Sequence, residues 1–424
     1  MKCKRGFLFL AGVFFLLSAC DEFNGRAAVL LTDRPEFALY AEQFNVSQDK
    51  YKVEVIYKNN IADDFYNTKS KEGPDIIAGS WLKSASTLKY WQSLEFLFRK
   101  NPELEKSFYP SLLALGRFDN RQYLLPVSFN LPIIIFSENN DTLIPGPFTI
   151  EPEEVKTLGK NFNEEKNNVY TRMGFSPLWN NNFLFETAVI FNASFREDDP
   201  LGWNEEELLE AIQYIRGWID QTNGGLKAED EFFFKYFFDP PQKLVIANRI
   251  LFAYMNSSAF FTMSNETQTN LDFRMLSGGG LIPVSEDAVY YGLSKKGNSK
   301  NAAREFTVWF FREETQMLLL EKSREKHLSD TIFGIANGFS ALHTVNENIF
   351  PLYYPMLLGH MPPADLLTAP NILPKNWMDI KERVVIPCLR DACRGENDTP
   401  LKQRLDDWMR INNSSFNGGR QLVP

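Results

Sequence analysis

The sequence predicts an α/β protein of two lobes, each a mostly parallel sheet flanked by helices, hinged by segments that cross between them. Three observations support this prediction. Short apolar runs alternate with stretches of helical periodicity from residue 27 onward, as in strand–helix–strand units. Two extended stretches, 123–137 and 281–295, interrupt this alternation where a chain would cross between lobes. Removal of a predicted export signal of 19 residues leaves 405 of the 424 residues, enough for two cores.

The first lobe begins with strands and helices in alternation. Residues 27–31 are a short apolar run typical of a buried strand, and 52–57 alternate apolar and polar side chains as a second strand does. Between them, Pro35 suits the first position of a helix whose apolar residues recur at helical spacing. A second helix is expected at 61–68 and a third strand at 75–78, and this order favours a parallel sheet.

The second lobe is expected to have its own alternation. Prolines divide 123–137 into two extended pieces, which we expect to carry the chain across. Helices are predicted at 149–162, 183–191 and 204–220, the last with acidic residues in its first turn, and a strand is predicted at 250–255.

Residues 281–295 are expected to return the chain to the first lobe, where 298–322 predict a helical stretch divided near Glu314-Thr315. Further helices are predicted at 346–361, 376–384 and 400–411. The domain assignment that follows is a signal at 1–19, a spacer at 20–26, lobe 1 at 27–130 plus 286–345, lobe 2 at 131–285 plus 346–411, and a mobile tail at 412–424.

The N-terminus has the pattern of an export signal. Three positive residues precede an apolar stretch, 6–17, that is too short to span a bilayer as a helix. The run Leu17-Ser18-Ala19-Cys20 then resembles the bacterial lipobox. That resemblance implies cleavage before Cys20 and a lipid on its thiol, which would anchor the exported protein to the cell membrane, facing the periplasm or the cell surface. The alternative is an ordinary signal peptide followed by an unrelated cysteine.

Charge and motifs exclude several classes of function. The whole chain has a formal charge of −9, and loss of the signal makes it more acidic, which disfavours nucleic acid as a partner. No apolar run after the signal is long enough to cross a membrane. The three histidines lie too far apart for a metal site, and no phosphate-binding, dinucleotide-binding or nucleophile motif occurs. We therefore expect no metal, no cofactor and no catalytic residue.

Cys388 and Cys393 are the two cysteines that remain after the signal and Cys20. A disulfide between them would be plausible in an exported protein. The spacing matches neither a redox pair nor a zinc site. The residues leave two alternatives open, a structural disulfide and free thiols.

Four segments carry a resemblance to a known family: GPDIIAGSWL (73–82), YLLPVSFNLPIIIFS (123–137), ILFAYMNSSAF (250–260) and the segment 282–316. In this order and behind a lipobox, they resemble the bacterial extracellular solute-binding proteins, family 1, which are receptors of carbohydrate-type ABC importers. The resemblance spans most of residues 27–325. It departs where Phe136-Ser137 stand in place of a usual Tyr-Asn pair, and GFSPLWNNNF has no clear counterpart, which leaves the ligand open.

The resemblance implies a periplasmic-binding-protein fold and a binding function. Two lobes would close on a solute, favoured to be a sugar or oligosaccharide, and the closed form would dock on ABC permease subunits. It implies a receptor that is not an enzyme and that we expect to be a monomer. A surface lipoprotein with a sensor or adhesion role and a carbohydrate-active enzyme remain as alternatives. An enzyme would need a close pair of carboxyl groups, whereas the acidic pairs 63–64, 198–199 and the run 205–207 look solvated.

Candidate ligand-binding residues lie where predicted strands end, because ligands of such sheets bind at the carboxyl ends of strands. Asp33 and Arg34 follow the first strand, where a carboxylate could bridge two hydroxyl groups; a solvated turn is the alternative. Trp81 follows the third strand and Trp179 ends a turn in the second lobe. Aromatic rings stack on the apolar faces of sugars, although both tryptophans could instead belong to the core.

Three further candidates come from the crossing and from the second lobe. Asn130 lies on the first crossing segment and Asn256 just after a second-lobe strand. Their amides both donate and accept hydrogen bonds, which suits hydroxyl groups. Tyr254 lies on the same strand and is the weaker candidate, because strand alternation could turn it into the core.

Overall fold

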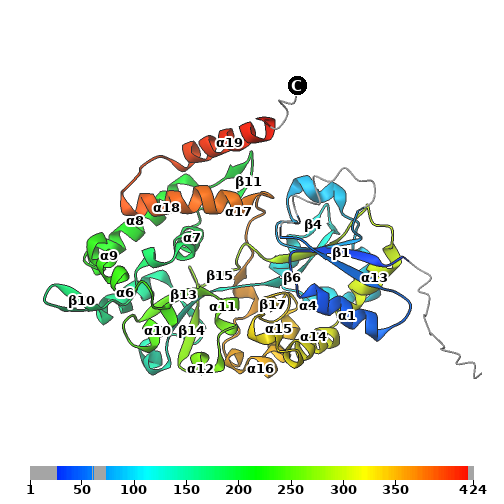
Figure 1. The fold of residues 1–424 in the computed structure, drawn as a ribbon, viewed down its shortest axis with the longest axis horizontal. Coiled ribbons are helices and arrows are strands. Elements are labelled where there is room, and N and C mark those ends of the chain that lie inside the picture. The colour runs from blue at the N-terminus through cyan, green and yellow to red at the C-terminus, as the bar shows by residue number, and fades with distance from the viewer. Residues whose placement is uncertain (1–25, 60, 62–72, 419–424) are drawn as a thin grey trace, which may run out of the picture.

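A computed structural model describes residues 26–59, 61 and 73–418. The predicted signal, Cys20, most of the spacer and most of the expected helix at 61–68 lie outside these residues. Among the residues that are described, no helix combines the length and the apolar character needed to cross a membrane. The described chain forms two lobes, seen side by side in Figure 1, and each lobe has its own sheet.

The larger sheet belongs to the first lobe and has the strand order β17-β6-β16-β3-β1-β2. β1 pairs in parallel with β2 and β3, as expected from the strand–helix alternation. β16 is antiparallel to both β3 and β6. The strands are β1 (Ala28–Thr32), β2 (Val53–Tyr57), β3 (Ile76–Gly79), β6 (Leu124–Phe129), β16 (Val289–Leu293) and β17 (Phe339–Ser340).

The smaller sheet belongs to the second lobe and has the order β13-β7-β14-β8. β7 (Pro132–Ser137) is antiparallel to β13 (Phe252–Asn256) and β14 (Leu271–Leu276), and β14 is parallel to β8 (Thr149–Ile150). The α/β two-lobed class is therefore confirmed, but the sheets are mixed rather than mostly parallel. A strand that leaves one lobe and a strand that returns to it run in opposite directions, which makes β6 and β16 antiparallel.

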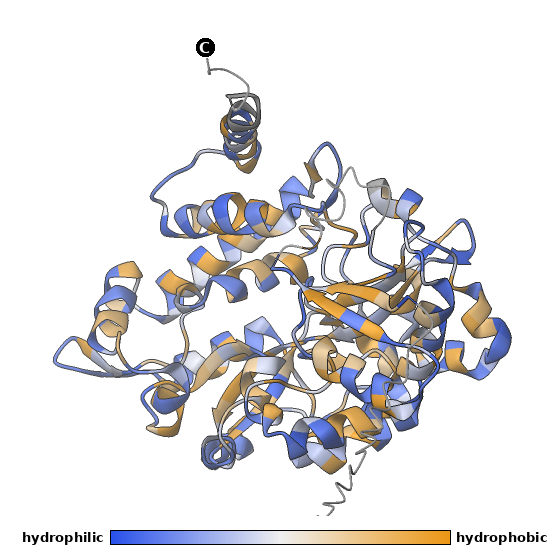
Figure 2. Ribbon diagram, turned by 45° about the vertical axis from the view of Figure 1, so that its right-hand side comes forward, coloured by the Kyte–Doolittle hydropathy of each residue, from blue (hydrophilic) through white to orange (hydrophobic). Residues whose placement is uncertain are grey.

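Two crossings position the functional region. The first is very short, because the chain leaves the larger sheet at Phe129 and enters the smaller one at Pro132. On the return, β15 (Ile282–Pro283) lies just before the larger sheet's β16 and pairs in parallel with β18 (Leu367–Thr368). The strands on both sides of the first crossing are completely buried, since helices cover the sheets, and Figure 2 shows the strands of the sheets as largely hydrophobic.

Helices surround both sheets (Figure 1). Those of the first lobe are α1 (Phe37–Ser47), α3 (Glu95–Lys100), α4 (Pro102–Ser107), α5 (Pro110–Ala114), α13 (Lys300–Phe310), α14 (Glu313–Glu325), α15 (His343–Asn348) and α16 (Phe350–Tyr353). Those of the second are α6 (Pro152–Phe162), α7 (Asn181–Ile190), α8 (Glu205–Thr222), α9 (Leu226–Lys235), α10 (Pro241–Ile246), α11 (Ser257–Phe261), α12 (Asn265–Gln268), α17 (Trp377–Ile380), α18 (Ile386–Arg394) and α19 (Leu401–Gly418). A π-helical turn, Lys381–Val385, joins α17 to α18.

Helices α15 and α16 differ from the domain assignment, which placed 346–411 with lobe 2. α15 packs against α14 and β17 of the first lobe. The ring of Phe350 lies 5.7 Å from that of Phe333 and 6.0 Å from that of Phe339, so α16 completes the same aromatic cluster. The chain joins the core of the second lobe only after β18.

The disulfide alternative for Cys388 and Cys393 is wrong in this structure, where both thiols are free and buried. Both residues lie on α18. They are five positions apart on the helix, which separates them by about 7.5 Å along the axis and by about 140° around it, beyond the reach of a disulfide. Burial raises the pKa of the Cys393 thiol to about 12, which disfavours the reactive thiolate.

We expect iodoacetamide to leave both cysteines unmodified in the folded protein and to modify both after denaturation. Burial shields the two thiols and suppresses their ionisation. Peptide mass mapping of samples alkylated before and after denaturation measures this. A peptide that carries a Cys388–Cys393 disulfide would contradict the structure.

Candidate functional site

A cluster of charged side chains lies where the two lobes meet. Its members come from the loops after β1 and β3, from residues 284–288 of the return crossing, from α7, and from the π-helical turn after α17. The strands end at this edge, so the loops that follow them face the second lobe. The interlobe cluster consists of Asp33, Arg34, Glu36, Lys83, Glu186, Glu286, Asp287 and Lys381.

Asp33 and Arg34 are tied to the end of β3. A guanidinium nitrogen of Arg34 donates to Ser80 Oγ at 2.8 Å, and the backbone N–H of Ser80 donates to Asp33 Oδ2 at 3.4 Å. Ser80 Oγ in turn donates to the backbone carbonyl of Asp287 at 2.7 Å, which connects both loops to the return crossing. The side chains of Asp33 and Arg34 are only 14% and 22% exposed, so the solvated-turn alternative is wrong. Burial raises the pKa of Asp33.

Trp81 reaches across from the first lobe to the second. Its φ is +63°, a left-handed conformation that is unfavourable for a bulky side chain. Its side chain is partly buried against the core of the second lobe. Nearby, Ser84 Oγ donates to the Glu197 carboxylate, and the backbone N–H of Ala85 donates to Glu197 Oε2 at 2.9 Å. These contacts join the lobes. A strained backbone conformation such as that of Trp81 is found most often at functional sites.

Lys83 is a buried cation next to Trp81. Its Nζ lies 4.1 Å from the centroid of the Tyr290 ring, a cation–π contact. Burial lowers the pKa of Lys83 to about 7, against the opposing effect of Asp287 and Glu286. The ammonium group therefore loses its proton more easily than an ordinary lysine does.

Glu286 and Lys381 form a buried ion pair between the return crossing and the second lobe. Burial alone would lower the pKa of Lys381, but Glu286, Glu186 and Asp287 raise it overall. Glu186 lies beside this pair on α7. Burial raises the pKa of Glu186 to about 8, with a further contribution from the charge of Glu286. With a pKa near this value, the carboxyl group of Glu186 stays protonated near neutral pH in the folded protein.

Four buried polar atoms of the interlobe cluster make no hydrogen bond to the described residues: Asp33 Oδ1, Arg34 Nε, Glu36 Oε2 and Asp287 Oδ1. Arg34 Nε lies 3.5 Å from Asp33 Oδ1, an ion pair without hydrogen-bond geometry. A buried polar group without a partner costs about 1–3 kcal/mol, so such groups rarely gather without a role. Three acceptors and one donor at one place suit a ligand that carries several hydroxyl groups.

Asn130 and Asn256 are engaged by the protein itself. Asn130 Nδ2 donates to the backbone carbonyl of Asn337 at 2.9 Å, and its Oδ1 accepts from Ser257 Oγ at 2.9 Å. Asn256 Oδ1 caps α11 by accepting from the backbone N–H of Ser258 at 3.1 Å. The structure thus uses the Asn130 amide to join the first crossing to both lobes, and the Asn256 amide to cap a helix of the second lobe.

Trp179 and Tyr254 line a cavity of about 260 Å³ within the second lobe. The turn that carries Trp179 is held by Ser176, whose Oγ donates to Glu229 Oε2 at 2.7 Å. Asn223 Nδ2 donates to the other oxygen of the same carboxyl group at 2.6 Å. Tyr254 is almost completely buried, and burial together with the charge of Glu186 raises its pKa. Tyr254 therefore lines this cavity and also experiences the charge of Glu186 in the interlobe cluster.

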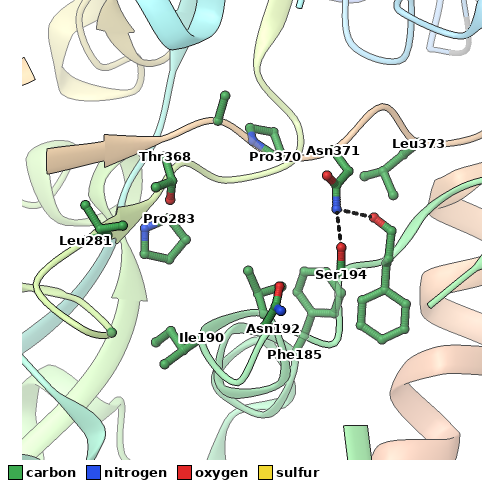
Figure 3. Close-up of a pocket in the computed structure, with 14 residues that line it drawn as sticks. Phe185, Ile190, Asn192, Ser194, Leu281, Pro283, Thr368, Pro370, Asn371 and Leu373 are labelled. Carbon is green, nitrogen blue, oxygen red and sulfur yellow. Dashed lines mark hydrogen bonds between the residues drawn. The ribbon is translucent and has the colours of Figure 1, made fainter. Parts of the chain in front are cut away.

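A second cavity, of about 310 Å³, lies between the end of α7 and the strands β15 and β18 (Figure 3). Asn371 Nδ2 closes one side by donating to Ser194 Oγ and to the backbone carbonyl of Phe195, both at 3.1 Å. None of the residues predicted to bind ligand lines it. We therefore take the interlobe cluster and the cavity lined by Trp179 and Tyr254 as the candidate site.

Sequence reasoning missed six members of the interlobe cluster: Glu36, Lys83, Glu186, Glu286, Asp287 and Lys381. Glu186 is a single carboxylate within an otherwise largely apolar helix, and Glu286-Asp287 are adjacent acids inside a crossing segment, so both carried a signal. Lys83 follows Trp81 by two residues, but a lysine in a loop is ordinarily solvated. Lys381 gave no signal, because its role depends on a partner 95 residues away in sequence.

Comparisons with known proteins place the fold. No family model matches the chain, and no curated protein matches it. Among solved structures, the sugar-binding protein MalE from Xanthomonas citri aligns with a TM-score of 0.64 and 13% identity over 92% of this chain and 99% of its own. An ABC substrate-binding protein from Listeria monocytogenes in complex with cycloalternan aligns with a TM-score of 0.59 and 16% identity over 91% and 98% of the two chains.

A third structure, a cyclo/maltodextrin-binding protein complexed with maltotetraose, aligns with a TM-score of 0.60 and 14% identity over 94% of this chain and 99% of its own. All three alignments cover nearly the whole of both chains. At these identities the likeness concerns the fold. The chain therefore has the two-lobed fold of the periplasmic binding proteins, and structures of this fold include many sugar-binding ABC substrate-binding proteins.

Proposed function

We propose that this protein is the substrate-binding lipoprotein of an ABC importer and that it captures a sugar or oligosaccharide between its two lobes. The lipid on Cys20 would hold it at the membrane, and the loaded form would deliver the sugar to permease subunits. The fold and the interlobe cluster together support this proposal. Similar structures are named as binding proteins for maltose-type and cyclic oligosaccharides.

The observation that carries the proposal is the position of Trp81. Its strained backbone projects the ring from the first lobe onto the second, and the loop after β1 and the return crossing hold buried polar atoms that make no hydrogen bond to the described residues. A sugar ring has apolar faces and a rim of hydroxyl groups, so it needs an aromatic surface and several hydrogen-bonding groups together. The end of β3 and the end of β1 supply both at one place.

Ligand binding would select the closed arrangement. Ser84 and Ala85 of the first lobe bond to Glu197 of the second, and these contacts exist only while the lobes are together. A ligand held by both lobes adds its own contacts to the same state and shifts the population toward it. The crossing residues Asn130 and Ser257 stay bonded to each other and serve as the hinge.

We expect Trp81→Ala to weaken sugar binding at least about 10-fold, since the loss of one aromatic contact is about 1.4 kcal/mol or more. A thermal-shift panel of sugars and oligosaccharides identifies the ligand, and isothermal titration measures the affinity. Trp309→Ala is the matched control, because Trp309 is also partly buried in the first lobe but packs against Phe44, away from the interlobe cluster. Unchanged binding in Trp81→Ala, or an equal loss in both variants, would contradict the proposed site.

A carbohydrate-active enzyme remains the second candidate, because Glu186 is buried and the charge of Asp287 acts on it. A carboxyl group with a raised pKa is a feature of glycosidase acids. The binding proposal predicts that a bound oligosaccharide is recovered intact after prolonged incubation. Hydrolysis that Glu186→Gln abolishes would favour the enzyme instead. A sensor or adhesion lipoprotein would bind the sugar without supporting its uptake.

A further inference from the structure

The cavity of Trp179 is chemically unlike the interlobe cluster. Seven aromatic side chains line it: Phe175, Trp179, Phe232, Phe233, Tyr236, Phe237 and Tyr254. Apart from the Trp179 N–H and the hydroxyl groups of Tyr236 and Tyr254, its polar side chains are Asn180 and Asp239. Asn180 Oδ1 already caps α7 by accepting from the backbone N–H groups of Asn182 and Phe183. A whole sugar ring in this cavity would leave most of its hydroxyl groups without partners, which is costly.

The size and shape of the lining suit a flat apolar group. The cavity is about 260 Å³. An apolar cavity of about 150 Å³ is sufficient to bind benzene, so this one accommodates a one-ring or two-ring aromatic group. Trp179 stacks on Phe232 with ring centroids 5.6 Å apart and an angle of 19° between the planes. A guest ring would gain offset or edge contacts with such walls.

One polar group of the lining residues is buried without a hydrogen-bond partner in the described part of the chain. Trp179 Nε1 is buried and makes no hydrogen bond to the described residues. An indole N–H only donates, so its partner must be an acceptor such as an ether or hydroxyl oxygen. Tyr254 links this cavity to the interlobe cluster, since it lines the cavity and lies within the electrostatic influence of Glu186 and Glu286.

We propose that the cavity of Trp179 is a binding site for an aromatic group, and that the ligand of this protein is a glycoside whose aromatic aglycone enters this cavity while its sugar lies at the interlobe cluster. The sugar half rests on the proposed function, whereas the aromatic half stands on the cavity alone. The acceptor for Trp179 would be the oxygen that joins the two halves.

The mouth of the cavity provides a matched pair of variants. Phe233 and Phe237 line the cavity and are 43% and 58% exposed, with ring centroids 5.6 Å apart. Phe234 and Phe238 are their chain neighbours, are 82% and 92% exposed, and do not line it. Each double substitution removes two phenyl rings from an exposed surface, so both variants should fold.

The test is isothermal titration of the full chain with 2-naphthol. We expect saturable binding at one site, at least a 10-fold loss in F233A/F237A, and less than a twofold change in F234A/F238A. Phenol should bind more tightly than cyclohexanol, which has a similar size but no aromatic ring. Equal losses in the two double variants, or no binding of 2-naphthol by the folded wild-type protein, would overturn the proposal.

A second titration tests whether one ligand uses both the sugar site and the aromatic cavity. Phenyl glucosides and mannosides should bind at least 10-fold more tightly than the matching methyl glycosides, and F233A/F237A should remove this difference. If 2-naphthol binds but no glycoside does, the cavity proposal holds and the sugar-binding function fails. If methyl and phenyl glycosides bind equally, the sugar site stands and the aglycone assignment is wrong.

Discussion

Lys381→Met is expected to lower the free energy of unfolding by about 3–5 kcal/mol, because it leaves Glu286 without its partner in a buried position. The two side chains are 8% and 10% exposed. The removed cation also offsets the charges of Glu186 and Asp287, so the loss affects three carboxyl groups. Methionine keeps most of the volume of lysine, which limits the contribution of a cavity. Equilibrium denaturation with urea, followed by circular dichroism, measures the change.

Two further variants separate the ion pair from other causes. Lys106→Met removes a partner of Glu103 in an ion pair whose side chains are 73% and 76% exposed, and we expect a change below about 1 kcal/mol. The double variant Lys381→Met/Glu286→Gln should regain much of the loss, since no buried charge is then left unpaired. Additive losses in the double variant would show that the two side chains act independently.

Local patterns in the sequence predicted the parts of the site that follow strands. Asp33 and Arg34 stand directly after an apolar run, and Trp81 follows the end of β3 by two residues, so the position of each loop at the sheet edge could be inferred. The change of sheet between Phe129 and Pro132 could be inferred too, because prolines divide that stretch. These features depend on periodicity and turn chemistry within about ten residues.

Contacts between distant segments could not be predicted in the same way. The bond from Ser84 to Glu197 joins residues 113 apart in sequence, and it depends on how the lobes come together. The antiparallel pairing of β16 depends on the direction in which the chain returns. The left-handed backbone of Trp81 has no sequence signature either, since tryptophan is not a residue that favours positive φ.

The two amides show how one pattern allows two roles. Asn130 and Asn256 were predicted to bind ligand because an amide can both donate to and accept from hydroxyl groups. In the structure, both amides make hydrogen bonds within the protein instead. Ser257 donates to Asn130, and Ser258 donates to Asn256. A residue that both donates and accepts serves a hinge as well as a ligand, and only the positions of its neighbours distinguish the two.

Glu186→Gln is expected to make the protein more stable than the wild type at pH 8 and to change little at pH 4. Burial raises the pKa of Glu186 to about 8, above its ordinary value of 4.5, so the unfolded chain ionises first as the pH rises. Between these two values the folded state holds one more proton than the unfolded state, and stability falls with pH by up to about 5 kcal/mol. Glutamine does not ionise, so the variant lacks this loss.

The groups that face Glu186 determine the size of this effect. Glu286 and Asp287 oppose its ionisation from the return crossing, whereas Lys381 favours it from the π-helical turn. Urea denaturation at several pH values between 4 and 9 gives the difference between variant and wild type, which should grow between the two pKa values and level off above the higher one. Glu206→Gln, on the exposed first turn of α8, is the matched control and should leave the pH profile unchanged. A constant difference across the range would mean that Glu186 is ionised in the folded protein, and the interlobe cluster would then hold more negative charge than we infer.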